Sequence, residues 1–116
     1  MSTSLGELSA SPAISVILPV LNEEPHLDES VSAILSQDYQ GIFDVILSLG
    51  PSQDRTNEIA NALVLRDNRV KLVANPTGKT AAGLNLAIAA SQSSVMVRVD
   101  GHAKIPNNYL SLAIEI

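Results

Sequence analysis

An aspartate and a histidine two positions apart are the side chains of this chain best suited to hold a metal ion. Asp100 and His102 follow an apolar run, residues 95–99, that has the composition of a buried strand. Ligands of α/β proteins collect beyond the carboxyl ends of parallel strands, and Gly101 allows the backbone to turn there. A carboxylate oxygen and an imidazole nitrogen could therefore converge on one cation. The plainer alternative for so short a pattern is a turn aspartate beside a surface histidine.

Composition indicates a single globular domain without a nucleic-acid partner. The chain has 116 residues, enough for one domain, and 46% of them are hydrophobic against 16% charged. The formal net charge is −5, and Lys and Arg form no cluster that could hold a nucleic-acid backbone. Cysteine is absent, which excludes disulfides and thiolate chemistry. No apolar stretch approaches the roughly 20 residues of a membrane span, so we expect a cytoplasmic protein.

Apolar runs and helical spacing alternate along the chain after a loose, serine-rich tail expected at residues 1–12. Strands are predicted at residues 14–18, 43–49, 70–74 and 95–99. Helices are predicted at residues 24–37, from a cap at Asp54, at residues 80–90, and from Pro106 to the end. In the helix at residues 80–90, Ala81, Leu84 and Ile88 are expected to face inward.

This alternating order, with strands that are apolar on both faces, predicts an α/β fold over residues 13–116. The sheet should be mainly parallel and covered by helices on both sides. The last helix carries no stop signal before Ile116. We therefore expect the domain to be cut short at its C-terminus.

The loops between these elements lack two common nucleotide-binding fingerprints. The first strand-to-helix turn contains no G-x-G-x-x-G, which disfavours a Rossmann dehydrogenase. Residues 78–80, Gly-Lys-Thr, imitate the end of a P-loop, but Val73 stands where that loop requires glycine. A Walker-type ATPase is disfavoured for that reason.

Four segments at strand ends together resemble the N-terminal, nucleotide-sugar-binding half of the family-2 inverting glycosyltransferases, which have a Rossmann-like GT-A fold. Residues 14–24, ISVILPVLNEE, are similar to that family's opening strand and P-x-x-N-E turn. Residues 75–87 are similar to its N-x-G and L-N-x-A segment, and residues 99–102 stand where the family has its D-x-D motif. The resemblance covers the chain from about Ile14 to the end.

Two departures from the family pattern bear on the ligand. Residues 49–52, Leu-Gly-Pro-Ser, stand where the family usually has Asp-Asp-Gly-Ser, and Asp54 and Thr56 after them match the family. The carboxylate that accepts a hydrogen bond from uracil in the family is therefore absent, which puts a uridine donor in question. The second aspartate of the D-x-D motif is His102, which can still bind Mn²⁺. Both variants look most like bacterial transferases of the succinoglycan-assembly type.

The resemblance implies the donor-binding half of an enzyme that moves a sugar, with inversion, from a nucleotide-diphosphate sugar to a glycan or lipid-linked acceptor. Asp100 and His102 would hold a divalent cation, Mn²⁺ or Mg²⁺, that assists the reaction. The residues implied to meet the nucleotide donor are Pro19, Asn22, Glu23, Asp54, Lys79, Asn85 and Asp100. The catalytic base of the family belongs to the second half of the domain, so no catalytic residue is assigned and the chain alone is expected to be inactive. Membrane association, at the inner face, is expected only through residues beyond Ile116.

Plainer roles remain open for several of these residues. Asp54 could act only as a helix cap, Asn85 could bond to backbone, and Lys79 could be a solvated surface residue. Arg98 stands in an otherwise apolar strand and is expected to face a carboxylate or the ligand, because burying an unpaired guanidinium is costly. For the chain as a whole, the alternative to the enzyme is a non-catalytic nucleotide- or metal-binding α/β module.

Overall fold

The computed structural model describes residues 11–115, and nearly all of the tail expected at residues 1–12 lies outside that range. The strands are β1 (Ile14–Val20), β2 (Phe43–Leu49), β3 (Val70–Ala74) and β4 (Val95–Arg98). The helices are α2 (Leu27–Leu35), α3 (Thr56–Arg66), α4 (Thr80–Ala90) and α5 (Tyr109–Glu115). None of these helices is long and apolar enough to cross a bilayer.

The strands form one parallel sheet in the order β3-β2-β1-β4, which confirms the predicted α/β class. β1 pairs with β2 along its whole length, from Ile14 to Val20, and with β4 only from Ile14 to Ile17. The expected strand at residues 14–18 therefore continues through Pro19. Proline is tolerated at that position because the ladder with β4 has already ended and Pro19 is paired only with Ser48 of β2.

Two of the helices begin later than the sequence predicts. α2 begins at Leu27 rather than at residue 24, because the backbone N–H groups of His26 and Leu27 both donate to the carbonyl of Glu23 and form a turn there. α5 begins at Tyr109 rather than at Pro106. The delayed start of α2 leaves Glu23 in a turn, where its side chain can face the end of the sheet.

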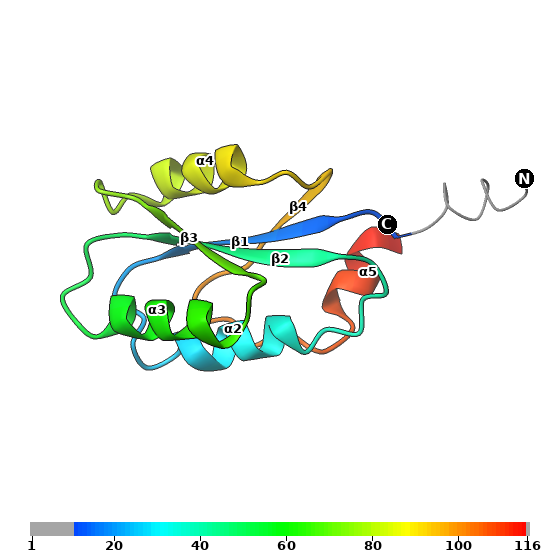
Figure 1. Cartoon of the computed structure of the whole chain (residues 1–116), viewed down its shortest axis with the longest axis horizontal. Coiled ribbons are helices and arrows are strands. Elements are labelled where there is room, and N and C mark those ends of the chain that lie inside the picture. Colours follow the sequence, from blue (N-terminus) through cyan, green and yellow to red (C-terminus); the bar gives the residue numbers. More distant parts are fainter. Residues whose placement is uncertain (1–10, 116) are drawn as a thin grey trace, which may run out of the picture.

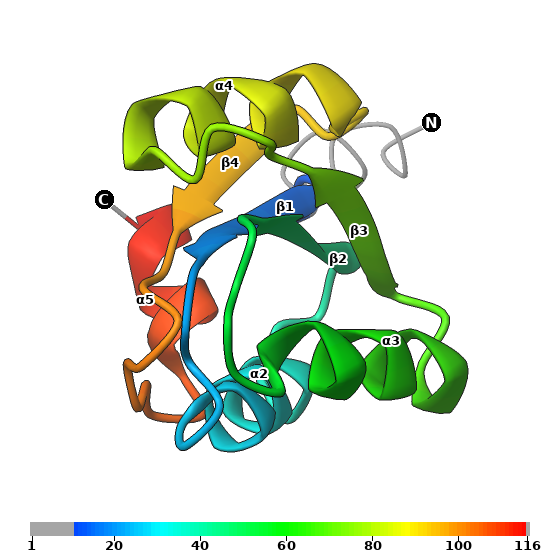
Figure 2. The same cartoon turned by 90° about the vertical axis from the view of Figure 1, so that its left-hand side faces the viewer.

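The helices cover both faces of the sheet, as Figures 1 and 2 show. Of the helices in residues 11–115, α2, α3 and α5 lie on one face and α4 lies on the other. The larger core lies between the sheet and the first group, and its fully buried side chains include Val16, Leu18, Leu27, Ile34 and Leu110. The core under α4 is small and is built from Ile17, Ile46 and Ala87.

The inward face of α4 differs from the face expected at residues 80–90. Leu84 is partly buried, as expected, but Ala81 is exposed and Ile88 is 44% exposed, so their inward placement was wrong. Gly83 and Ala87 are buried in their place. The residues of α4 are apolar on nearly every side, so no hydrophobic stripe distinguishes the buried face in the sequence. The small side chains let α4 lie close to the sheet.

Candidate functional site

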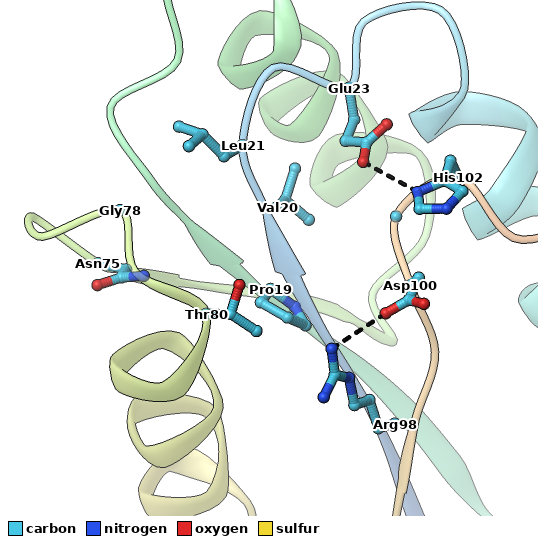
Figure 3. A pocket seen from close by; sticks show the side chains of 11 residues that line it. Pro19, Val20, Leu21, Glu23, Asn75, Gly78, Thr80, Arg98, Asp100 and His102 are labelled. Carbon is cyan, nitrogen blue, oxygen red and sulfur yellow. Dashed lines mark hydrogen bonds and ion pairs between the residues drawn. The ribbon is translucent and has the colours of Figure 1, made fainter.

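A pocket of about 190 Å³ opens where β1 and β4 end and α4 begins (Figure 3). Its walls come from the end of β1 and the turn after it, the loop before α4, and the end of β4 with the loop that follows. The pocket therefore lies at the carboxyl edge of the parallel sheet, where α/β proteins bind their ligands. Four residues predicted from the sequence line it together: Pro19, Glu23, Asp100 and His102.

Glu23 and His102 contact each other across this pocket. The Glu23 Oε2 atom lies 3.2 Å from the His102 Nδ1 atom. The Glu23 side chain is only 20% exposed, whereas that of His102 is 61% exposed. Gly101 makes the approach possible, because a Cβ atom at this position would lie 3.1 Å from the Cγ atom of Glu23. The turn before α2 thus holds the loop after β4.

Arg98 and Asp100 form a second pair beside the first, on the same segment that carries His102 (Figure 3). An Arg98 guanidinium nitrogen lies 3.3 Å from the Asp100 Oδ1 atom, and both side chains are 52% exposed. The expectation that Arg98 faces a carboxylate is confirmed, although the side chain is not buried. Arg98 and Asp100 also line a second hollow together with Tyr109, so their pair borders both spaces.

Asn22 and Asp54 lie outside the pocket and tie two loops together. The backbone N–H of Gln53 donates to the Asn22 side-chain oxygen at 2.8 Å, and the N–H of Asn22 donates to the Ser52 hydroxyl at 2.9 Å. Asn22 has a φ of 52°, in the left-handed region that asparagine tolerates better than most residues. These bonds hold the turn after β1 against the loop after β2.

Asp54 binds the backbone at the start of α3, although the N-cap position is Arg55 and not Asp54 as the plainer interpretation predicts. It accepts hydrogen bonds from the backbone N–H groups of Thr56, at 2.9 Å, and Glu24, at 3.2 Å, and from the Thr56 hydroxyl. The bond from the Thr56 hydroxyl lowers the pKa of Asp54 below its ordinary value, and the two backbone N–H groups lower it further. The buried Thr56 hydroxyl also accepts from the N–H of Glu23 at 2.8 Å. Asp54 therefore supports the turn that carries Glu23.

Lys79 and Asn85 are exposed and do not line the pocket. Lys79 is the residue before α4, and its backbone is fixed by Asn75 and Thr77. Asn85 lies on the exposed part of α4 rather than between strands. A contact of either side chain with the donor stays a prediction.

Asn75, Gly78 and Thr80 line the pocket, and the residue-by-residue prediction had missed them. Asn75 is 3% exposed, and its side-chain amide donates to the carbonyl of Lys79 at 3.0 Å. Gly78 has a φ of +69°, which favours glycine. The Asn-Pro-Thr-Gly pattern of residues 75–78 could have indicated these residues, because Asn and Gly in this order are typical of a constrained turn. This turn sets the start of α4 beside the pocket.

The donor set at the pocket fits a divalent cation with two protein ligands. Asp100 offers carboxylate oxygens and His102 an imidazole, a mixture that Mn²⁺ accepts. With the His102 proton on Nδ1, facing Glu23, the Nε2 atom is left free for a cation, as in many metal-binding histidines. Among residues 11–115 no group of three or more His, Asp or Glu is close enough to hold a metal by itself. The remaining ligands would have to come from the bound molecule and water.

Comparison with known proteins identifies relatives of this chain. Residues 15–116 match the family described as Glycosyl transferase family 2. An uncharacterized glycosyltransferase of Haemophilus influenzae is 35% identical over 100 residues, which are 85% of this chain and 40% of the relative. The succinoglycan biosynthesis protein ExoA of Rhizobium meliloti is 29% identical over 114 residues, which are 97% of this chain and 34% of the relative. The chain thus spans well under half the length of these relatives.

Solved structures share the fold. The mannosyltransferase PcManGT from Pyrobaculum calidifontis, in complex with GDP-Man and Mn²⁺, superposes with a TM-score of 0.78 at 25% identity. The match covers 92% of this chain and 34% of that one. S. aureus TarS 1-349, in complex with UDP, superposes with a TM-score of 0.78 at 24% identity over 89% of this chain and 31% of that one.

Proposed function

The chain belongs to glycosyl transferase family 2, and on that premise we propose that its pocket binds the nucleotide-diphosphate part of a sugar donor. The observation that carries this proposal is the pocket at the carboxyl edge of the sheet, which combines Arg98, Asp100 and His102. A guanidinium and a metal-binding pair are the groups that a diphosphate requires. The beginning of α4, with Thr80 in the wall, adds the positive end of a helix dipole.

We propose that Asp100 and His102 hold a divalent cation, Mn²⁺ or Mg²⁺, with the donor. When bound, the cation would act as a Lewis acid for the negative charge on the leaving diphosphate. Glu23 would orient the His102 ring through its contact with Nδ1. The Mn²⁺ in the GDP-Man complex of PcManGT supports this assignment.

The transfer itself requires more than these residues supply. Inversion needs a base that takes the proton of the acceptor hydroxyl. We assign no residue of this chain to that role, and we propose that the chain alone binds donor without transferring sugar. We propose a glycan or lipid-linked acceptor, and the name of the succinoglycan biosynthesis relative supports the glycan. The complete enzyme would work in the cytoplasm, at the inner face of a membrane.

Calorimetric titration of UDP and GDP, in Mn²⁺ and in EDTA, tests the donor proposal. We expect binding of at least one nucleotide that is about tenfold tighter with Mn²⁺, and Asp100→Asn should remove most of that difference. Asp28→Asn is the matched control, because Asp28 is a similarly exposed carboxylate that pairs with Arg66 outside the pocket. If neither nucleotide binds with or without the cation, the proposal is wrong. If Asp28→Asn has the same effect as Asp100→Asn, the metal assignment is wrong.

A further inference from the structure

Within the described range, residues 11–115, Arg98 is the one Lys or Arg side chain that lines the pocket. The carboxylates of Glu23 and Asp100 line the same walls, so the pocket without a cation would repel a diphosphate. Lys79, the cation favoured by the sequence, is exposed and outside the lining. Arg98 is therefore the side chain placed to make a direct charge contact with phosphate.

The sheet register fixes where Arg98 points. Side chains alternate between the two faces of a strand, and Val99 next to it is buried in the larger core. Arg98 is paired with Ile17, whose side chain lies in the small core under α4. In Figure 3 its guanidinium points up toward Pro19 and Asp100. The same group is already held by Asp100, at 3.3 Å.

The ion pair between Arg98 and Asp100 is weak enough to exchange. Both side chains are 52% exposed, and exposed pairs are worth little because water and salt screen them. The guanidinium bonds Asp100 through one nitrogen only, at 3.3 Å, whereas a diphosphate carries more negative charge and offers several oxygens to its planar fork of N–H groups. Asp100 is also the carboxylate that a cation would need.

We propose that Arg98 exchanges partners when the donor binds: it leaves Asp100 for the diphosphate, and Asp100 is then free for the cation. This inference rests on the proposed function. The Arg98–Asp100 pair makes the two ligands cooperative, because occupation of Asp100 by a cation releases the guanidinium, and capture of the guanidinium by phosphate releases the carboxylate. By linkage, each ligand raises the affinity for the other by the same factor.

Arg98→Gln separates this role from a merely structural one, because its effects on the two ligands have opposite signs. Mn²⁺ alone should bind about two- to fivefold more tightly, since the guanidinium that competes with Mn²⁺ for Asp100 is gone. The nucleotide, measured at saturating Mn²⁺, should bind about tenfold more weakly, since a charged hydrogen-bonding partner is lost. Arg98→Lys keeps the charge without the fork and should lose less nucleotide affinity than Arg98→Gln.

The experiment measures free Mn²⁺ by electron paramagnetic resonance and nucleotide binding by calorimetry, for UDP and GDP separately. Arg66→Gln is the matched control, because Arg66 pairs with Asp28 at similar exposure, 55% and 60%, away from the pocket. Opposite shifts in Arg98→Gln, absent from Arg66→Gln, support the exchange. If the wild type binds nucleotide and both Arg98→Gln and Arg98→Lys bind it within about twofold of the wild-type affinity, the exchange alone is overturned. If the wild-type chain binds no nucleotide, the proposed function is overturned and the exchange with it.

Discussion

The carboxylate of Glu23 lies 3.2 Å from the imidazole of His102, although the two residues are 79 positions apart in the chain. Glu23 belongs to the turn between β1 and α2, and His102 to the loop after β4. The contact therefore joins the two strands whose ends form the pocket. The less exposed Glu23 is the better fixed partner, so the orientation of the His102 ring depends on it.

Removing the Glu23 carboxylate should weaken cation binding without removing a ligand. Glu23→Ala is expected to lower the Mn²⁺-dependent part of nucleotide binding about tenfold, because the His102 ring loses the acceptor that orients it. Glu23→Gln keeps an oxygen acceptor and should lose much less. Titration calorimetry in Mn²⁺ and EDTA would measure both variants. Equal effects of Ala and Gln would show that the charge of Glu23, and not its acceptor atom, matters.

His102→Ala should abolish most of the metal-dependent gain in nucleotide affinity and leave the fold intact. The His102 side chain is 61% exposed and lies in a loop, where a truncation costs little stability. Circular dichroism and the Tm should stay at their wild-type values while calorimetry loses the difference between Mn²⁺ and EDTA. His26→Ala is the control, because its ring lies 6.5 Å from that of His102 but outside the pocket lining. Unfolding of His102→Ala would instead make this histidine structural.

The pair of Asp67 and Arg69 should make stability depend on pH in acid. Arg69 donates side-chain hydrogen bonds to both carboxylate oxygens of Asp67, at 3.1 and 2.8 Å, and these bonds lower the pKa of Asp67 to about 2. Because the folded pKa lies below the unfolded value of about 3.9, the pair stabilises the fold above that value. The contribution is then lost as the pH falls through about 2.

Asp67→Asn should therefore lower stability at pH 7 by at most about 1 kcal/mol, since the pair is partly exposed. Its Tm should approach that of the wild type as the pH falls from about 4 to about 2. Thermal melts over this range measure the effect. Glu58→Gln is the control, because Glu58 is 69% exposed in its pair with Arg55 and should change little. A constant Tm difference at every pH would contradict the linkage.

The outer edge of β4 should make the 116-residue chain self-associate. Along the described residues β4 pairs only with β1, and Met96 on this strand is 42% exposed. An open strand edge beside apolar surface favours pairing with another copy. Met96→Lys should shift sedimentation toward the monomer, whereas Leu65→Lys, at a 90% exposed position on α3, should not. A stable wild-type monomer at high concentration would contradict this prediction.

The order and type of the secondary-structure elements could be predicted from the sequence. The strands at 43–49 and 70–74 and the helix at 80–90 have the predicted bounds. Runs of Val, Ile and Leu that are apolar on both faces require burial on both faces, and with helices between them this leads to a parallel sheet. The sequence also located the site in outline. Parallel strands end at one edge, so Glu23, Asp100 and His102 were expected at the same edge of the sheet.

The tertiary structure decided which side chains meet within that outline. The sequence placed Lys79 among the residues that meet the donor and expected Arg98 to face a carboxylate or the ligand, and the structure has Arg98, not Lys79, in the pocket wall. It also selected Gly83 and Ala87 as the buried face of α4, although Ala81 and Ile88 fit the helical spacing equally well. A helix that is apolar on nearly every side carries no stripe, so only its contact with the sheet decides its rotation. That rotation leaves Asn85 exposed. The contacts of Glu23 with His102 and of Arg98 with Asp100 depend on strand register and loop conformation, which no local pattern of residues encodes.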